Sequence, residues 1–249
     1  MNDLIRKAAR LLIETDNAVA LTGAGVSVES GIPPFRGKGG LWEEFDPMEY
    51  AHIDSFLADP AKVWKVLLSR INNMLNEAKP NYSHIGLAKL EEMGILKAVI
   101  TQNVDGLHFA GGSKNVIEFH GNFAWQVCLK CQKRLETSKI TLDKIPPECE
   151  CGGIYKPDAV FFGEMINPAN LMRARELSAQ CDVMLVMGTS ATVEPSAYMP
   201  YIAKQGGAVI IEINPEKTPL TNSVASLFIK GKSGEIMKAV IAEIDRLKS

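Results

Sequence analysis

Four of the five cysteines crowd into one short stretch of the chain, where they could bind a metal ion. Cys128 and Cys131 are separated by two residues, and Cys149 and Cys151 by one. Two such pairs place four thiolates on two tight turns, an arrangement suited to tetrahedral zinc. Because sulfur would fill all four positions, none is left for water, and the zinc is expected to be structural. The alternative is that these cysteines are core residues, the interpretation we give to Cys181.

A second candidate for chemistry is the glycine-rich turn Gly23-Ala24-Gly25, which follows an apolar run of strand length. Glycines let the backbone approach a pyrophosphate closely, and amide groups at the start of a following helix would meet its charge. Val28 stands where the usual dinucleotide-binding pattern has its third glycine. The pattern by itself therefore leaves two interpretations open, a cofactor loop and a plain turn between a strand and a helix.

A third candidate is His120, which ends a strand-like run at 116–119 and precedes Gly121. Glycine permits an irregular turn there, with the imidazole facing a cleft. The ordinary pKa of histidine, about 6.5, suits a general base near neutral pH. The three other histidines receive structural interpretations: His52 on a surface insert, His84 at a helix start and His108 in an apolar contact.

The elements that must position these residues alternate between strands and helices. Several strand-like runs are apolar throughout, which is typical of strands covered on both faces. This alternation predicts an α/β fold with an open, doubly wound, mostly parallel sheet. The strand-like runs are 18–21, 97–100, 160–162, 183–187 and 209–213, and helices are expected at about 2–15, 83–93, 168–179 and 233–247.

Polar and glycine-rich segments follow four of the predicted strands, at 22–25, 101–105, 188–190 and 214–216. Ligands of such sheets bind beyond the carboxyl ends of the strands, so we expect these segments to meet at one site. Two other segments break the alternation and are interpreted as insertions. The predicted large domain is 1–36, 80–124 and 158–249, and the small domain combines a helical insert at 37–79 with a zinc-binding insert at 125–157.

Composition excludes several classes of protein. Of 249 residues 46% are hydrophobic and 22% are charged, as in an ordinary globular protein. The net charge is 27 − 29 = −2, which predicts no direct binding to nucleic acid. The first residues lack the pattern of a signal peptide, and no apolar run reaches the ~18 residues of a membrane span. We therefore expect a cytoplasmic protein with no membrane partner.

Several ordered motifs resemble those of the sirtuins, a family of NAD-dependent protein-lysine deacetylases. They are GAGVSVESGIPPFR, TQNVDGLH, the His-Gly pair at 120–121, FFGE and GTS, and with Asn214 they extend over most of the chain. The chain departs from the family pattern at Pro34, where Asp is frequent, and in the second cysteine pair, which has one intervening residue where sirtuins have two. The resemblance implies a Rossmann-like sheet with a smaller zinc-ribbon and helical domain inserted.

The resemblance also implies a set of NAD contacts. The glycine loop would hold the pyrophosphate, Phe35 and Arg36 would close over the nicotinamide ribose, and the segment at 102–105 would line the nicotinamide pocket. Residues after later strands would contact the adenosine side. The implied residues are Gly23, Ala24, Gly25, Phe35, Arg36, Gln102, Asn103, Asp105, Gly188, Ser190, Asn214 and Lys232.

The reaction implied by the resemblance transfers the acyl group of an acetyl-lysine to ADP-ribose. His120 would be the general base, with Asn103 as a second catalytic residue. The products would be nicotinamide, the deacetylated lysine and 2′-O-acetyl-ADP-ribose. The expected partners are proteins or peptides with acetyl-lysine, a chromatin protein among the candidates.

The same resemblance implies where the substrate binds. The stretch Val160–Glu164 is similar to the family's substrate-pairing strand, in which an extended peptide adds to an exposed edge. We assign Val160, Phe162, Gly163 and Glu164 to substrate and interpret Phe161 as core. Desuccinylating sirtuins have a Tyr three residues before an Arg, where this chain has Leu67 and Arg70. The expectation is a preference for acetyl over succinyl groups, whether or not Arg70 reaches the substrate.

Two other functions stay open from the sequence. A mono-ADP-ribosyltransferase would share the NAD pocket but pass ADP-ribose to a protein side chain. A non-catalytic NAD sensor or zinc-ribbon binding module would need no base. His120-Gly121 and the FFGE segment favour deacylation over both, and the incomplete glycine pattern disfavours a hydride-transferring dehydrogenase.

Overall fold

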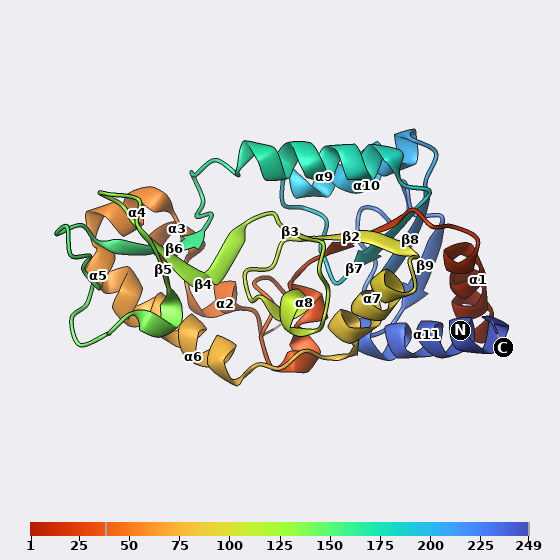
Figure 1. Cartoon of the computed structure of the whole chain (residues 1–249), viewed down its shortest axis with the longest axis horizontal. Helices are drawn as coiled ribbons and strands as arrows, with labels where there is room; N and C mark the ends of the chain where they lie inside the picture. Colours follow the sequence, from red (N-terminus) through yellow and green to blue (C-terminus); the bar gives the residue numbers. More distant parts are fainter. Residues whose placement is uncertain (38, 249) are drawn as a thin grey trace.

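The computed structural model describes residues 1–37 and 39–248. A large α/β part and a small part lie end to end, and both termini lie at the far end of the large part (Figure 1). The elements of the large part are α1 (Asn2–Ile13), β1 (Ala18–Thr22), α7 (Tyr82–Glu92), β2 (Leu96–Thr101), α8 (Leu107–Ala110), β3 (Val116–Glu118), α9 (Pro168–Gln180), β7 (Val183–Met187), α10 (Met199–Gln205), β8 (Val209–Asn214), β9 (Leu227–Lys230) and α11 (Ser233–Lys248).

The main sheet has six strands in the order β3-β2-β1-β7-β8-β9, and all its pairs are parallel. Numbered along the sheet's own strands, this is the 3-2-1-4-5-6 order of the Rossmann fold. The chain reverses its direction of travel between β1 and β7, so loops leaving these two strands diverge and open a crevice. The predicted fold class is confirmed.

Two separate cores cover the two faces of this sheet. Alternate residues of β1 point to opposite faces, with Ala18 and Ala20 toward one core and Val19 and Leu21 toward the other. The first core contains residues of α1, α7 and α11, and the second contains residues of α9 and α10. Burial on both faces explains why the strands are apolar throughout.

The small part combines short helices with a three-stranded antiparallel sheet of order β5-β4-β6. Its strands are β4 (Gly121–Cys128), β5 (Arg134–Glu136) and β6 (Tyr155–Ala159). Its helices are α2 (Leu41–Glu44), α3 (Pro47–Tyr50), α4 (Ile53–Ala58), α5 (Pro60–Val63), a π-helical stretch at Trp64–Leu68, and α6 (Ser69–Glu77). The predicted domain boundary at 124/125 falls inside β4, and the one at 157/158 falls inside β6. The division of the chain into two domains stays a prediction.

One sequence-based expectation about the strands is wrong, and one strand of the main sheet was not predicted. The run at 160–162 is not a strand of the parallel sheet, because the chain pairs with β4 at 155–159 and then leaves it. Phe161 packs into the core of the small part instead, beside Phe56 and Trp64. The strand β9 was not predicted from the sequence. Among the described residues, no helix is long and apolar enough to cross a membrane.

Candidate active site

A cavity of about 1290 Å³ lies at the crevice between the main sheet and the small part. It opens beyond the carboxyl ends of β1, β2, β7 and β8. Ligand sites of such sheets are expected there, next to the point between β1 and β7 where the strand order reverses. Every residue that we assigned to catalysis, NAD or substrate lines this cavity, apart from Asp105 and Arg70. Several other lining residues were not predicted, because they are apolar or lie in irregular loops with no motif: Trp42, Leu68, Ile71, Phe123, Val193 and Glu194.

The glycine loop after β1 is packed against the loop after β7. A Cβ atom at Gly23 would lie 2.8 Å from the Thr189 side chain, and one at Gly25 would lie 2.7 Å from the Gly188 main chain. The two glycines are therefore needed for loop-to-loop approach. The helix expected to follow them is absent from the described chain, which forms only the three-residue turns Ala24–Val26 and Val28–Ser30. Gly25 packs closely against the main chain of Gly188, and this contact explains why the chain turns after Val26 and does not continue as a helix.

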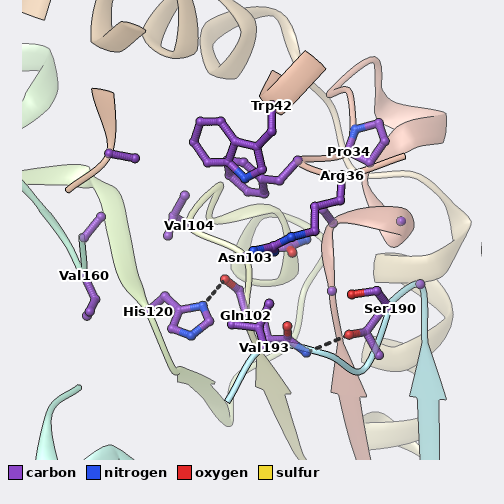
Figure 2. Close-up of a pocket in the computed structure, with 18 of the residues that line it drawn as sticks. Pro34, Arg36, Trp42, Gln102, Asn103, Val104, His120, Val160, Ser190 and Val193 are labelled. Atoms are coloured by element: carbon purple, nitrogen blue, oxygen red, sulfur yellow. Dashed lines mark hydrogen bonds between the residues drawn. The ribbon is translucent and has the colours of Figure 1, made fainter. Parts of the chain in front are cut away.

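His120 lies at the end of the chain segment that links β3 to β4, and its imidazole faces the cavity (Figure 2). Its Nδ1 is 3.0 Å from the main-chain oxygen of Gln102. A carbonyl oxygen can only accept, so Nδ1 carries the proton and Nε2 keeps its lone pair. Within the described residues, no hydrogen-bond partner of Nε2 is found. Burial lowers the pKa of His120, and the bond to Gln102 opposes this only in part. The ring is thus held neutral, with Nε2 available as a base.

Gln102 and Asn103 are fixed by bonds to neighbouring loops. Nε2 of Gln102 donates to Oγ1 of Thr189 at 3.0 Å, and Nδ2 of Asn103 donates to Oγ of Ser27 at 3.0 Å. These bonds cross from the loop after β2 to the loops after β7 and β1. Both amide side chains line the cavity with their orientations set before any ligand binds.

Asp105 does not line the main cavity. One carboxylate oxygen accepts from Oγ of Ser27 at 2.7 Å, and the other accepts from the main-chain nitrogen of Leu107 at 2.9 Å. The carboxylate also lies 3.2 Å from Nδ2 of Asn103. Asp105 therefore braces Ser27 and Asn103, and it lines a smaller adjoining pocket together with Asn103 and Phe35. Its direct contact with the nicotinamide stays a prediction.

Two other histidines lie beneath this network. The rings of His84 and His108 contact each other with centroids 4.8 Å apart, and both side chains are buried. Nδ1 of His84 accepts from the main chain of Asn81 in a capping box at the start of α7. Burial lowers the pKa of His84 to about 4, so this ring is neutral at pH 7. The structure agrees with the structural interpretation of both residues.

The segment after the glycine loop covers the cavity. The ring of Phe35 stacks on Trp42 with centroids 5.3 Å apart. The exposed Arg36 side chain extends toward Asn103, across from His120 in Figure 2. An arginine at the mouth of a cavity can pair with phosphate or ribose oxygens.

The residues expected on the adenosine side gather at the ends of β7, β8 and β9. Nδ2 of Asn214 donates to the main chain of Thr189 at 2.8 Å, which ties the two loops together. Ser190 is exposed, and its hydroxyl is 2.9 Å from that of Thr192. Lys232 is also exposed and lies 3.4 Å from Glu235. The hydroxyl of Ser190 and the ammonium of Lys232 each keep further hydrogen-bonding capacity for a ligand.

The segment at 160–164 forms the opposite wall of the cavity. The main-chain nitrogen of Val160 donates to the oxygen of His120 at 2.8 Å. Phe162 is 37% exposed, yet its main chain bonds to Ala51 and Ile53, which makes a short bridge to the helical insert. Fewer main-chain groups of this segment are therefore free to pair with a peptide than the sequence pattern predicted, because the helical insert already bonds to Phe162.

Leu67 and Arg70 behave differently. Leu67 is buried and lines the cavity from the π-helical stretch. Arg70 is exposed and pairs with Glu44 through both guanidinium NH groups, at 2.5 and 3.0 Å. Its guanidinium also lies over the ring of Phe45 at 5.5 Å. Arg70 is thus held outside the cavity by its own partners.

The four cysteines of the zinc-binding prediction lie together, and their Sγ atoms are all within 4.8 Å of one another. The Cys128–Cys151 and Cys131–Cys149 sulfur distances are 3.5 and 3.8 Å. With Zn–S bonds of about 2.3 Å, a tetrahedral site needs sulfur atoms roughly 3.8 Å apart. The shortened second pair therefore still fits zinc. Cys181 lies apart from them, buried in the second core of the main sheet.

Comparisons with known proteins agree with this geometry. Residues 23–195 match the sequence model of the Sir2 family. The chain is 46% identical to an NAD-dependent protein deacylase of Pyrococcus furiosus, covering 98% of this chain and 99% of that protein. It is also 46% identical to NAD-dependent protein deacylase 1 of Archaeoglobus fulgidus, over 98% and 99% of the two chains.

Solved structures show the same relationship. A Sir2 homologue bound to ADP-ribose superposes with a TM-score of 0.92 at 44% identity, over 97% of each chain. A complex described as Sir2 with a p53 peptide and NAD⁺ superposes with a TM-score of 0.86 at 36% identity, over 95% of this chain and 97% of that one. Sequence motifs, sheet order and cavity thus lead to one conclusion: the chain belongs to the Sir2 family.

Proposed function

We propose that this protein removes acetyl groups from lysine side chains of proteins, with NAD as co-substrate. The broader activity, NAD-dependent protein deacylation, is the one named for its archaeal relatives. The finer assignment to acetyl groups is supported by a similar structure, a Sir2-homologue mutant in complex with 2′-O-acetyl ADP ribose. Acetylated proteins or peptides are the proposed substrates. A chromatin protein among them, a cytoplasmic location and the absence of direct nucleic-acid binding stay predictions.

The observation that carries the proposal is the state of His120. Its Nδ1 proton is committed to Gln102, its Nε2 faces the cavity, and burial keeps the ring neutral. A neutral imidazole with a free lone pair is a general base and cannot act as an acid at that atom. A non-catalytic NAD sensor would have no need for a base so arranged.

The cavity has room for both substrates and different walls for each. Loops after β1, β7 and β8 are the proposed NAD side, where main-chain amides, Arg36 and Asn214 would hold the dinucleotide. Bound NAD would supply the electrophilic ribose carbon and nicotinamide as the leaving group. Gln102 and Asn103 would orient the nicotinamide end through their fixed amides, and Phe35 with Trp42 would exclude water.

On the other wall, the segment at 160–164 would pair with the peptide main chain and direct the acyl-lysine into the cavity. Leu67 and Phe162 would contact the acyl group and the lysine stem. His120 would then take a proton from a ribose hydroxyl through Nε2, and that oxygen would bond to the acyl carbon. With the addition of one water the lysine amine would leave, so that the acyl group passes to ADP-ribose. The zinc site lies in the small part and would stabilise the sheet that carries this segment.

The test is to incubate the protein with NAD and an acetyl-lysine peptide and to analyse the products by mass spectrometry. We expect nicotinamide, deacetylated peptide and O-acetyl-ADP-ribose in equal amounts. Peptide that gains the mass of ADP-ribose would instead identify a mono-ADP-ribosyltransferase. No turnover of NAD with any acyl peptide would contradict the proposal.

A further inference from the structure

Lys156 is a buried charged residue that takes no part in the cavity wall. Its side chain is 7% exposed, although lysine is among the residues least often buried. It extends from β6, where its main chain pairs with Val127. Lysine is not retained in such a place without partners, because an unpaired buried ammonium is costly.

The partners of Lys156 lie at the end of β6 and in the segment that follows it. Nζ donates to the main-chain oxygens of Ala159 at 2.7 Å and Pro157 at 3.1 Å, and it pairs with Glu164 at 2.9 Å. It also lies 4.3 Å from the ring centre of Phe161. Burial lowers the pKa of Lys156, whereas the bond to Glu164 favours the charged form. The ammonium group of Lys156 thus binds the chain both before and after the short loop that runs from Ala159 to Glu164.

Glu164 completes this arrangement from the other side. The same oxygen that pairs with Lys156 accepts the main-chain N–H of Phe161 at 2.7 Å. The N–H of Glu164 in turn donates to the oxygen of Phe161 at 3.0 Å. The ring of Phe161 is held between the Lys156 ammonium and the edge of Phe56, with ring centroids 5.6 Å apart.

These contacts set which side chains face the cavity. Both Phe161 and Phe162 border the cavity, but Phe161 is 6% exposed and belongs to the core of the small part, whereas Phe162 is 37% exposed. Successive side chains of an extended segment point to opposite sides, so anchoring Phe161 in the core leaves Phe162 on the open side. A slip of one residue would bury Phe162 and move the bond between Val160 and His120. We infer that Lys156 is a positioning residue, which holds the segment at 160–164 in the register that binds the substrate peptide.

This inference rests on the proposed function, because it concerns the wall assigned to the peptide. The variant Lys156→Met keeps the length and apolar stem of the side chain but removes every donor. Lys156→Arg keeps the charge and donors and is the matched control. We expect Lys156→Met to raise the KM for an acetyl-lysine peptide by about tenfold, with kcat changed by less than about threefold. The KM for NAD should stay within about twofold, since the NAD side is built by other loops.

A merely structural role would raise both KM values together or lower kcat alone, and either pattern would overturn the inference. A peptide KM of Lys156→Met equal to that of the parent would overturn it too, as would failure of Lys156→Arg to restore at least part of the loss. If Lys156→Met does not fold, Glu164→Gln replaces it. That variant removes the charge pair but keeps an oxygen for Phe161, and the same split between KM values is expected.

Hydrogen exchange separates this inference from the proposed function. The amides of Phe161 and Glu164 should exchange at least about tenfold faster in Lys156→Met than in the parent, while those of β1 and β7 stay unchanged. This measurement needs no turnover. If exchange at 161–164 is the same in Lys156→Met and in the parent, the inference is contradicted even if the enzyme is active. If exchange is faster in Lys156→Met but the parent has no deacetylase activity, only the proposed function is contradicted.

Discussion

Nδ1 of His120 donates its proton to the main-chain oxygen of Gln102 across 3.0 Å. Main-chain oxygens do not titrate, so this partner fixes the tautomer of the ring over the whole working range of pH. The adjoining side chain of Gln102 is tied to Thr189 and lines the same cavity. One residue therefore orients the proposed base through its main chain and the proposed nicotinamide pocket through its side chain.

The pH dependence of the reaction should report the burial of His120. Desolvation lowers its pKa below 6.5, and a general base is active only when deprotonated. Activity should therefore fall as the pH drops through a value below 6.5 and should be level around neutrality. The measurement is kcat/KM for an acetyl-lysine peptide from about pH 5 to 8. An acidic limb with its midpoint at or above 6.5 would show that another group controls the rate.

The variant His120→Ala should lose deacetylation by about 100-fold or more, because His120 is the only histidine among the described residues that line the cavity. NAD should still bind with near-normal affinity, since the glycine loop and Asn214 are untouched. Product formation by mass spectrometry and NAD binding by calorimetry check the two halves. Activity within tenfold of the parent would remove His120 from the mechanism.

Acyl selectivity should depend on Leu67 and on the pairing of Arg70 with Glu44. We expect kcat/KM for an acetyl-lysine peptide to exceed that for the matched succinyl peptide by about tenfold or more, because a carboxylate beside Leu67 would meet an apolar side chain while Arg70 is paired with Glu44. Leu67→Tyr should narrow the gap by adding a hydroxyl. Leu67→Tyr combined with Glu44→Gln should narrow it further, because Arg70 is then released from its salt bridge.

Glu44→Gln alone is the matched control for that series, since it frees the guanidinium without supplying the hydroxyl. Its acetyl peptide kinetics should equal those of the parent. Desuccinylation by the parent that equals or exceeds deacetylation would show that neither residue limits the acyl group.

One zinc ion per chain should be found by metal analysis of fresh protein. Cys131→Ser should lose the metal and lower the melting temperature, because metal binding contributes free energy of folding. Cys181→Ser is the control: this cysteine is buried away from the cluster and donates to the Ser178 main chain. It should keep its zinc. A zinc-free parent, or equal metal loss in both variants, would refute the assignment of the four cysteines.

Local patterns were sufficient for most elements of the main sheet and for the residues that meet at the cavity. The helices found at Asn2–Ile13, Pro168–Gln180 and Ser233–Lys248 lie within two residues of their expected bounds, because periodicity and capping act over a few residues. The cysteine set and His120 could be identified because ligand spacing and short motifs are themselves local. The alternation of strands and helices predicted the parallel sheet, although it did not predict β9.

Tertiary structure decided what those side chains contact. Arg70 is turned from the cavity by Glu44, which is 26 residues earlier in the chain, and no pattern near Arg70 indicates such a partner. The main chain of Phe162 is occupied by Ala51 and Ile53. Lys156 looks like an ordinary charged residue in the sequence, yet the fold buries it against Glu164. The sequence alone determined which residues have the right chemistry; which of them stay free to use it depended on distant partners, because pairing and burial are set only when the chain is packed.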